Sequence, residues 1–225
     1  MSSSQMFPNS VSLNVSNMNA SLAFYRDKLG YKLNECWPSE GQPMWASLVL
    51  DGQVIMLGQA LPPGECEKMH AMSPVAAKFW SAQAAAFAKG THGAGVNLFI
   101  AVPDVDAYHA QLRQRGLEPV LPPTTQFYGL RDTVVVDPDG YVLTFYAPVK
   151  LESCQSCGMP LTNAAPGQMY CAYCVDEKGV LRPYEQVFQG TVHGYFMEHL
   201  KMPKEQAEKA AREHLAKMPA WCARG

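Results

Sequence analysis

Hydrophobic and polar residues alternate in two separate regions of the chain, and each region includes a helical pattern. The alternation over residues 134–146, VVVDPDGYVLTFY, predicts two strands joined by a tight DPDG turn, in which Gly140 is free to adopt positive φ. Successive side chains of a strand point to opposite faces, so Thr144 and Tyr146 share one face and Phe145 points to the other. One face therefore packs in a hydrophobic core, and the side chains of the other face are available to line a site.

The region that begins at Ser10, SVSLNVSNMNASLAFYRDKLGYKL, is matched by NLFIAVPDVDAYHAQLRQRGLEPV, which begins at Asn97. Each segment reads as a strand, then an amphipathic helix opened by a capping residue and ended by a glycine. The capping residues and glycines are Asn17 and Gly30 in the first segment and Asp104 and Gly116 in the second.

A second pair of segments, LVLDGQVIML and VVDPDGYVLTF, aligns Asp51 with Asp139, and the offset between the segments stays at 87 to 88 residues. A nearly constant offset indicates an internal duplication, with copies at about residues 8–60 and 93–149. Residues 60–92 join the copies, and their Ala-rich stretch predicts a helix that ends at Gly90.

Composition narrows the class of protein. The chain has 225 residues, of which 48% are hydrophobic, so it can bury a substantial core in one or two domains. A formal net charge of −2 gives no basic field for nucleic acid. The N-terminal segment lacks a secretory pattern, no apolar run is long enough to span a membrane, and a cytoplasmic location is expected.

Four of the seven cysteines form the pattern C-x2-C-x13-C-x2-C after the alternation stops at Pro148. Two such pairs bring four thiolates around one ion, the closed tetrahedral arrangement of structural zinc. A redox CxxC is the competing interpretation, but it requires a βαβ context and does not explain two pairs. The sequence therefore predicts a structural zinc site at Cys154, Cys157, Cys171 and Cys174.

The second domain is expected to cover residues 151–225, with helices near 184–200 and 203–217. In the second helix Ala207, Ala211 and Leu215 form the packing stripe. The domain holds eight Lys or Arg and eight Asp or Glu. A phosphate-binding surface usually carries a basic excess, so a structural or protein-docking role is favoured over nucleic-acid binding.

Residues 8–149 resemble the vicinal-oxygen-chelate superfamily of glyoxalase, bleomycin-resistance and dioxygenase proteins. The resemblance is carried by NMNASLAFYRDKLGY and FYGLRDTVVVDPDGYVLTFY. It implies an α+β domain over residues 1–150, in which paired βαβββ modules form a cup-shaped sheet, and it implies a homodimer. The run CQSCGMPL…YCAYC and its helical tail, about residues 152–221, resemble a small bacterial zinc-ribbon family.

Metal-using members of the superfamily place their ligands at positions that fall here on Ser10, Met56, Asn97 and Thr144. Sites for divalent transition metals rely on imidazole and carboxylate, which these four residues do not supply. The interpretation favoured here is a metal-free cup without catalytic residues. The alternative is a metal-dependent lyase, isomerase or dioxygenase whose ligands lie elsewhere.

A neutral cup with aromatic walls is typical of a small-molecule site. By resemblance, its ligand is an antibiotic or another toxic compound held by sequestration. A further alternative is a ligand-sensing regulator that acts through the ribbon. The residues predicted to contact the ligand are Ser10, Asn14, Trp45, Met56, Asn97, Phe99, Phe127, Tyr128, Thr144 and Tyr146.

Overall fold

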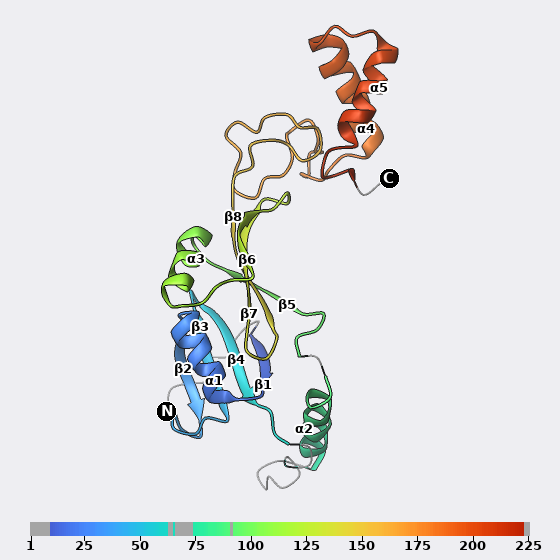
Figure 1. The fold of residues 1–225 in the computed structure, drawn as a ribbon. Helices are drawn as coiled ribbons and strands as arrows, with labels where there is room; N and C mark the ends of the chain where they lie inside the picture. Colours follow the sequence, from blue (N-terminus) through green and yellow to red (C-terminus); the bar gives the residue numbers. More distant parts are fainter. Residues whose placement is uncertain (1–9, 63–64, 66–73, 91, 223–225) are drawn as a thin grey trace. The chain divides into compact units, whose positions relative to one another are not determined.

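The computed structural model describes residues 10–62, 65, 74–90 and 92–222, which form two compact units (Figure 1). The first unit comprises the chain up to Pro123 together with Asp132–Tyr146. The second comprises Thr124–Arg131 together with the chain from Ala147 onward. Among the described residues, no helix has both the length and the apolar character needed to cross a bilayer.

The first module is a four-stranded mixed sheet with one helical segment. Its elements in chain order are β1 (Val11–Val15), α1 (Met18–Ala23), the π-helical turn η1 (Phe24–Lys28), β2 (Lys32–Trp37), β3 (Trp45–Leu50) and β4 (Gln53–Gln59). The strand order is β1-β4-β3-β2, with β1 parallel to β4 and the other pairs antiparallel. This is the predicted βαβββ arrangement.

The second module repeats the first. It contains β5 (Asn97–Ala101), α3 (Val105–Gln114), β6 (Leu121–Thr125), β7 (Leu130–Val136) and β8 (Val142–Pro148), in the strand order β5-β8-β7-β6. Ser12 pairs with Met56 in the first sheet, and Phe99 pairs with Thr144 in the second. These pairs differ by the predicted offsets of 87 and 88, so the duplication is confirmed at the level of strand register.

Local signals in the sequence set the ends of the helices. The side chain of Asn17 accepts a hydrogen bond from Ala20 N at 3.1 Å, and that of Asp104 accepts one from Ala107 N at 3.0 Å. Each cap satisfies a backbone N–H that the first helical turn leaves without a partner. After each helix the chain turns at a glycine with positive φ, as the sequence predicts.

The core of each module lies between one face of the sheet and its helix. Leu57, Leu143 and Phe145 are fully buried. The Phe145 ring packs against Tyr108 of α3, with ring centroids 4.6 Å apart. The residues that alternate with them point to the open face of each sheet, and the duplication therefore creates two open faces.

Equivalent hydrogen bonds join the two modules. The Gln53 side chain donates to Ala101 O at 2.7 Å and accepts from Ala101 N at 3.0 Å. At the positions 87 to 88 residues away, Tyr141 Oη donates to Asn14 O at 2.9 Å. In each module, a residue at the start of the last strand therefore forms hydrogen bonds to the backbone of the first strand of the other module.

Between the modules the chain forms α2 (Pro74–Phe87), the helix predicted for the connector. In the second unit two cysteine turns precede α4 (Tyr184–Gly190), the π-helical segment η3 (Thr191–His199) and α5 (Lys204–Leu215). Ala207, Ala211 and Leu215, the predicted stripe of α5, are all fully buried.

The module interface yields a first prediction. Gln53→Ala removes both partners of the Ala101 backbone, so the free energy of unfolding should fall by about 1–2 kcal/mol. Tyr141→Phe removes one donor at the equivalent position and should cost about 1 kcal/mol. Urea denaturation followed by circular dichroism measures both changes. Gln114→Ala, at an exposed position of α3, is the control, and equal stabilities for all three variants would contradict the proposed importance of these contacts.

Candidate functional site

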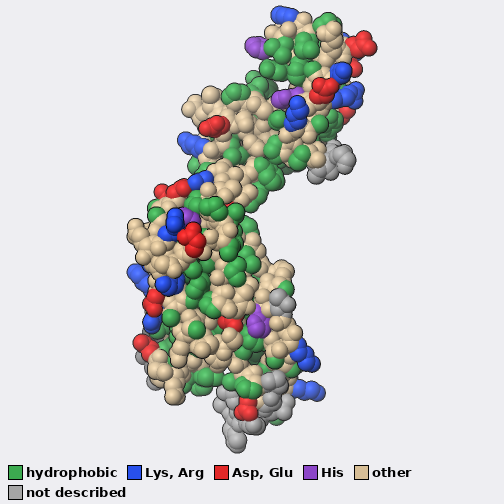
Figure 2. Space-filling model, viewed as in Figure 1, with side chains coloured by type: hydrophobic (Ala, Val, Ile, Leu, Met, Phe, Trp, Pro, Cys, Tyr) green, Lys and Arg blue, Asp and Glu red, His purple; other side chains and the backbone are tan. Residues whose placement is uncertain are grey.

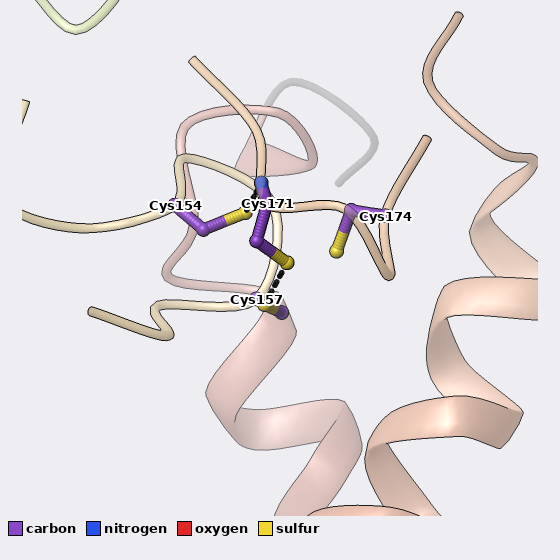
Figure 3. Close-up of side chains that lie close together, drawn as sticks. All are labelled: Cys154, Cys157, Cys171 and Cys174. Carbon is purple, nitrogen blue, oxygen red and sulfur yellow. Dashed lines mark hydrogen bonds between the residues drawn. The ribbon is translucent and has the colours of Figure 1, made fainter. Parts of the chain in front are cut away.

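The four predicted cysteines converge in the second unit (Figure 3). Their sulfur atoms all lie within 4.8 Å of one another, and the Sγ atoms of Cys157 and Cys171 are 3.7 Å apart. Three of the four side chains are buried. Among the described residues, this is the one group of three or more His, Cys, Asp or Glu side chains close enough to share an ion.

Two tight turns present these sulfurs. In the first turn, Gly158 N donates to Cys154 O at 2.8 Å, and Gly158 adopts a φ of +75°. In the second, Cys174 N donates to Cys171 O at 3.0 Å. Short antiparallel bridges at Ser153–Pro160 and Val175–Leu181 close the chain behind each turn. Each CxxC therefore has the hairpin support that points both of its sulfurs the same way.

Hydrogen bonds among the thiols separate their acidities. Bonds from Cys157 and then Cys174 lower the pKa of the Cys154 thiol well below its usual range. The bond to Cys154 raises the pKa of Cys157 to about 12, and a bond to the same sulfur raises the pKa of Cys174. These shifts favour a thiolate at Cys154 and protons on Cys157 and Cys174, and a bound cation would displace those protons.

The donor set fits a tetrahedral metal ion. Zinc bound to four thiolates at about 2.3 Å places neighbouring sulfurs about 3.8 Å apart, close to the 3.7 Å between Cys157 and Cys171. All four ligands are soft sulfur donors, a set that suits zinc or an iron–sulfur centre rather than magnesium or calcium. The cysteine cluster is therefore a candidate metal centre.

A second candidate site is a pocket in the first unit. It has a volume of about 240 Å³ and lies between the open face of the first sheet and α2. Its walls are mainly apolar and include four aromatic rings, and no ionisable side chain is found among the described residues that line it. The lining residues that carry side-chain polarity or aromatic area are Ser12, Asn14, Trp37, Trp45, Gln59, Trp80, Gln83 and Phe87.

The polar groups of the pocket divide into fixed and available ones. The Gln59 amide accepts a hydrogen bond from Met18 N at 2.9 Å and donates to Ser16 O at 2.9 Å, so it is fully committed to the first module. The Asn14 side chain, in contrast, makes no hydrogen bond to another described residue. Asn14 lies beside Gly58, where even a methyl group would stand 3.6 Å from its Oδ1. Asn14 is the amide best placed to meet a ligand.

Of the ten residues predicted to contact a ligand, Asn14 and Trp45 line this pocket. Met56 shares the same sheet face, since it pairs with Ser12 and Ser47 in neighbouring strands. Ser10 directly precedes β1. The first module thus holds four of the predicted residues on or beside one open face.

Four more of the predicted residues belong to the second sheet. Thr144 Oγ1 donates to Asn97 Oδ1 at 2.8 Å, and Thr144 is almost fully buried. The rings of Phe99 and Tyr146 meet edge to face, with centroids 5.7 Å apart. The remaining two, Phe127 and Tyr128, belong to the second unit, where their rings meet edge to face at 5.1 Å.

Sequence reasoning missed the contribution of α2. Trp80, Gln83 and Phe87 line the pocket, although the connector was expected only to join the modules. The signal available in the sequence was the aromatic pair Phe79–Trp80 within an otherwise Ala-rich helix. Because the helix packs mainly through small residues, two adjacent large rings indicate that at least one of them contacts another surface.

Charges are mixed on the surface of the second unit. On the face shown in Figure 2, acidic and basic side chains of this unit lie interspersed, without a continuous basic patch. This distribution agrees with the equal number of acidic and basic residues after position 150.

Two family models match the chain. Residues 8–145 match the "Glyoxalase/Bleomycin resistance protein/Dioxygenase superfamily", and residues 153–222 match a "Putative zinc ribbon domain". Both matches agree with the resemblances expected from the sequence. Among curated proteins, none matches the chain at a significant level.

Several solved structures are similar to this chain over 61–66% of its length. A glyoxalase/bleomycin resistance protein/dioxygenase from Nocardioides is 21% identical, with a TM-score of 0.46 over 66% of this chain and 87% of its own. TioX from Micromonospora sp. ML1 is 20% identical, with a TM-score of 0.45 over 61% and 94%. TnmS3, an antibiotic binding protein from Streptomyces sp. CB03234, is 23% identical, with a TM-score of 0.41 over 64% and 96%.

The cysteine cluster yields a second prediction. The purified protein should contain about one metal ion per chain, because among the described residues one set of four sulfurs converges. Cys154→Ser/Cys174→Ser should remove it, and metal analysis by mass spectrometry measures the loss. Cys222→Ser, which changes an exposed cysteine outside the cluster, should leave the metal in place. A stoichiometric ion in the double variant would reveal a different site.

Proposed function

The chain belongs to the glyoxalase/bleomycin resistance protein/dioxygenase superfamily, and from this premise we propose that it binds a small, uncharged aromatic molecule without chemical conversion. The ligand would occupy the pocket between the first sheet and α2. The observation that carries this proposal is the lining of the pocket, which combines three tryptophans and a phenylalanine with no ionisable group. Such a surface stacks against a flat ring and offers nothing to pair with a charge.

The polar groups of the pocket favour a ligand with one hydrogen-bonding edge. The Asn14 amide can donate and accept, and the Ser12 hydroxyl stands on the same strand face. A volume of about 240 Å³ suits a ligand the size of a few fused rings, or one ring system of a larger compound. Binding without conversion is sequestration, the mode expected for an antibiotic or toxic compound.

A metal-free cup is part of the proposal. The four positions at which metal-using relatives carry ligands hold Ser10, Met56, Asn97 and Thr144. The hydroxyl of Thr144 already donates to Asn97, so these two side chains satisfy each other. None of the four is an anion that could offset the cost of removing water from a divalent ion.

We further propose that the ion in the cysteine cluster is zinc and that its role is structural. The three most buried sulfurs belong to the same apolar cluster as Phe188, Val192 and Leu215. A closed set of four thiolates leaves no open position for a substrate. The ion would therefore stabilise the fold of the second unit rather than take part in a reaction.

A homodimer is also proposed, through the open face of the second sheet. Phe99 lies on this face and is 50% exposed, beside Tyr146. A second copy of the chain would remove the Phe99 ring from water. Phe99→Ser should then shift the protein towards monomer in sedimentation experiments. Phe79→Ser, at an equally exposed ring on α2, should leave the assembly unchanged.

The ligand proposal predicts that neutral planar aromatic compounds quench the tryptophan fluorescence of the full-length protein saturably. Trp80→Ala should weaken the affinity of any such compound about tenfold or more, because stacking area is lost. Val75→Ala is the matched control, since Val75 lies on the same helix, is 81% exposed and does not line the pocket.

Three other results would count against this function. Equal affinities of Trp80→Ala and Val75→Ala would place the ligand elsewhere. Preference for anionic or cationic compounds would contradict the uncharged lining. Turnover of a bound compound that depends on an added divalent metal would support the metal-dependent enzyme instead.

A further inference from the structure

The C-terminal end of the second unit holds the first cysteine turn. The three consecutive carbonyl oxygens of residues 155–157 each meet a donor from residues 214–221, the segment called here the clamp. The donors are Ala220 N at 3.0 Å, Trp221 Nε1 at 3.0 Å and His214 Nε2 at 2.9 Å. Since its partner is a carbonyl oxygen, the His214 Nε2 atom carries the proton.

The second cysteine turn has no such support from the clamp among the described contacts. The oxygens of Cys171 and Cys174 accept hydrogen bonds from Cys174 N and Arg182 N, which are close in sequence. Between them Tyr173 is 77% exposed. Of the two described turns, the clamp therefore donates hydrogen bonds to the first only. It supplies a donor for each carbonyl oxygen of residues 155–157, while the oxygen of Cys154 is bonded within the turn itself.

The clamp is tightly seated. Trp221 is 5% exposed, and its ring meets Tyr184 edge to face at 5.3 Å. A Cβ atom at Gly158 would lie 3.2 Å from His214 Nε2, a tight contact, and the positive φ of Gly158 also favours glycine at this position. The clamp begins at the end of α5, whose Leu215 is fully buried.

Ser156, in the centre of the first turn, carries a buried hydroxyl without an assigned partner. Its side chain is fully buried, and among the described residues its Oγ has no nitrogen or oxygen partner. A hydroxyl in this position loses its hydration without compensation. The nearby group that can accept its proton is the sulfur of Cys174, which lies close enough for the Ser156 hydroxyl to donate to it.

We propose that the clamp and Ser156 form a second layer of the metal centre. The clamp fixes the first turn so that the sulfurs of Cys154 and Cys157 face the ion, and the buried Ser156 hydroxyl donates a hydrogen bond to the Cys174 sulfur when that sulfur ligates the ion. Contacts behind the ligands of a metal commonly change its affinity by 10–100-fold. The inference rests on the proposed metal site, and it adds that metal occupancy and docking of the C-terminal segment are coupled in both directions.

The first test is zinc affinity, measured on the full-length protein by competition with a chromophoric chelator. Trp221→Phe keeps an aromatic ring and removes the donor, and His214→Phe does the same at the other position. Together with Ser156→Ala, each variant should bind zinc at least about tenfold more weakly. The controls are Ser153→Ala, one residue before the first cysteine, and Tyr184→Phe, which keeps the ring that packs on Trp221.

The second test is spectroscopic and separates a bond to sulfur from general destabilisation. In the cobalt(II)-substituted protein, Ser156→Ala should shift the sulfur-to-metal charge-transfer band to lower energy, because a thiolate without the hydrogen bond is a stronger electron donor. Ser153→Ala should leave the band in place. An unshifted band in Ser156→Ala would overturn the role of this hydroxyl.

The third test follows backbone amide exchange of residues 214–222 by mass spectrometry. Removal of zinc should speed exchange in this segment, whereas exchange in the first unit should stay unchanged. Equal protection with and without zinc, or wild-type zinc affinity in the clamp variants, would show that the segment only packs and would overturn the inference. A wild-type protein that binds no metal at all would instead contradict the proposed metal site, so the two failures are distinguishable.

Discussion

The parallel pairing of the first and last strands of each module is the constraint on which the rest of the first unit depends. This pairing sets Ser12 opposite Met56 and Phe99 opposite Thr144. Because side chains alternate between faces, a slip by one residue would turn every buried residue towards water. The register therefore determines at once which residues form the core and which remain on the open faces. The positions of the proposed ligand contacts on the strands follow from it.

The two modules share one architecture, but their open sheet faces have different neighbours. Hydrogen bonds at equivalent positions, such as those of Gln53 and Tyr141, join the modules in a nearly symmetric way. The aromatic pocket lies where α2 borders the open face of the first sheet. The open face of the second sheet leaves Phe99 half exposed. A duplicated fold can thus carry one enclosed pocket and one face suited to a partner, because the connector breaks the symmetry.

The second unit is organised around its sulfurs in a comparable way. Its apolar cluster includes three of the cysteines together with residues of α4, η3 and α5. The helices are thus packed on the metal-binding turns, and they return the chain to the first turn through Trp221 and His214. A metal ion in such a cluster would be coupled to helical packing, since ligands and core residues form one contiguous group.

The sequence by itself determined the duplication, the βαβββ order, the helix caps and the identity of the four cysteines. These features depend on short spacings: a cap acts over three residues, strand alternation has a period of two, and a CxxC turn spans four residues. Asn17, Asp104, Gly140 and Cys154 could therefore be assigned without a structure.

Only the tertiary structure decided what closes each site. Trp80 reaches the pocket across from Asn14, and Trp221 reaches Ser156 from 65 residues away. Neither contact has a local pattern, because the distance along the chain between the two partners says nothing about their distance in space. The faces that the sequence marks as open become a pocket or a metal centre only when distant elements pack against them.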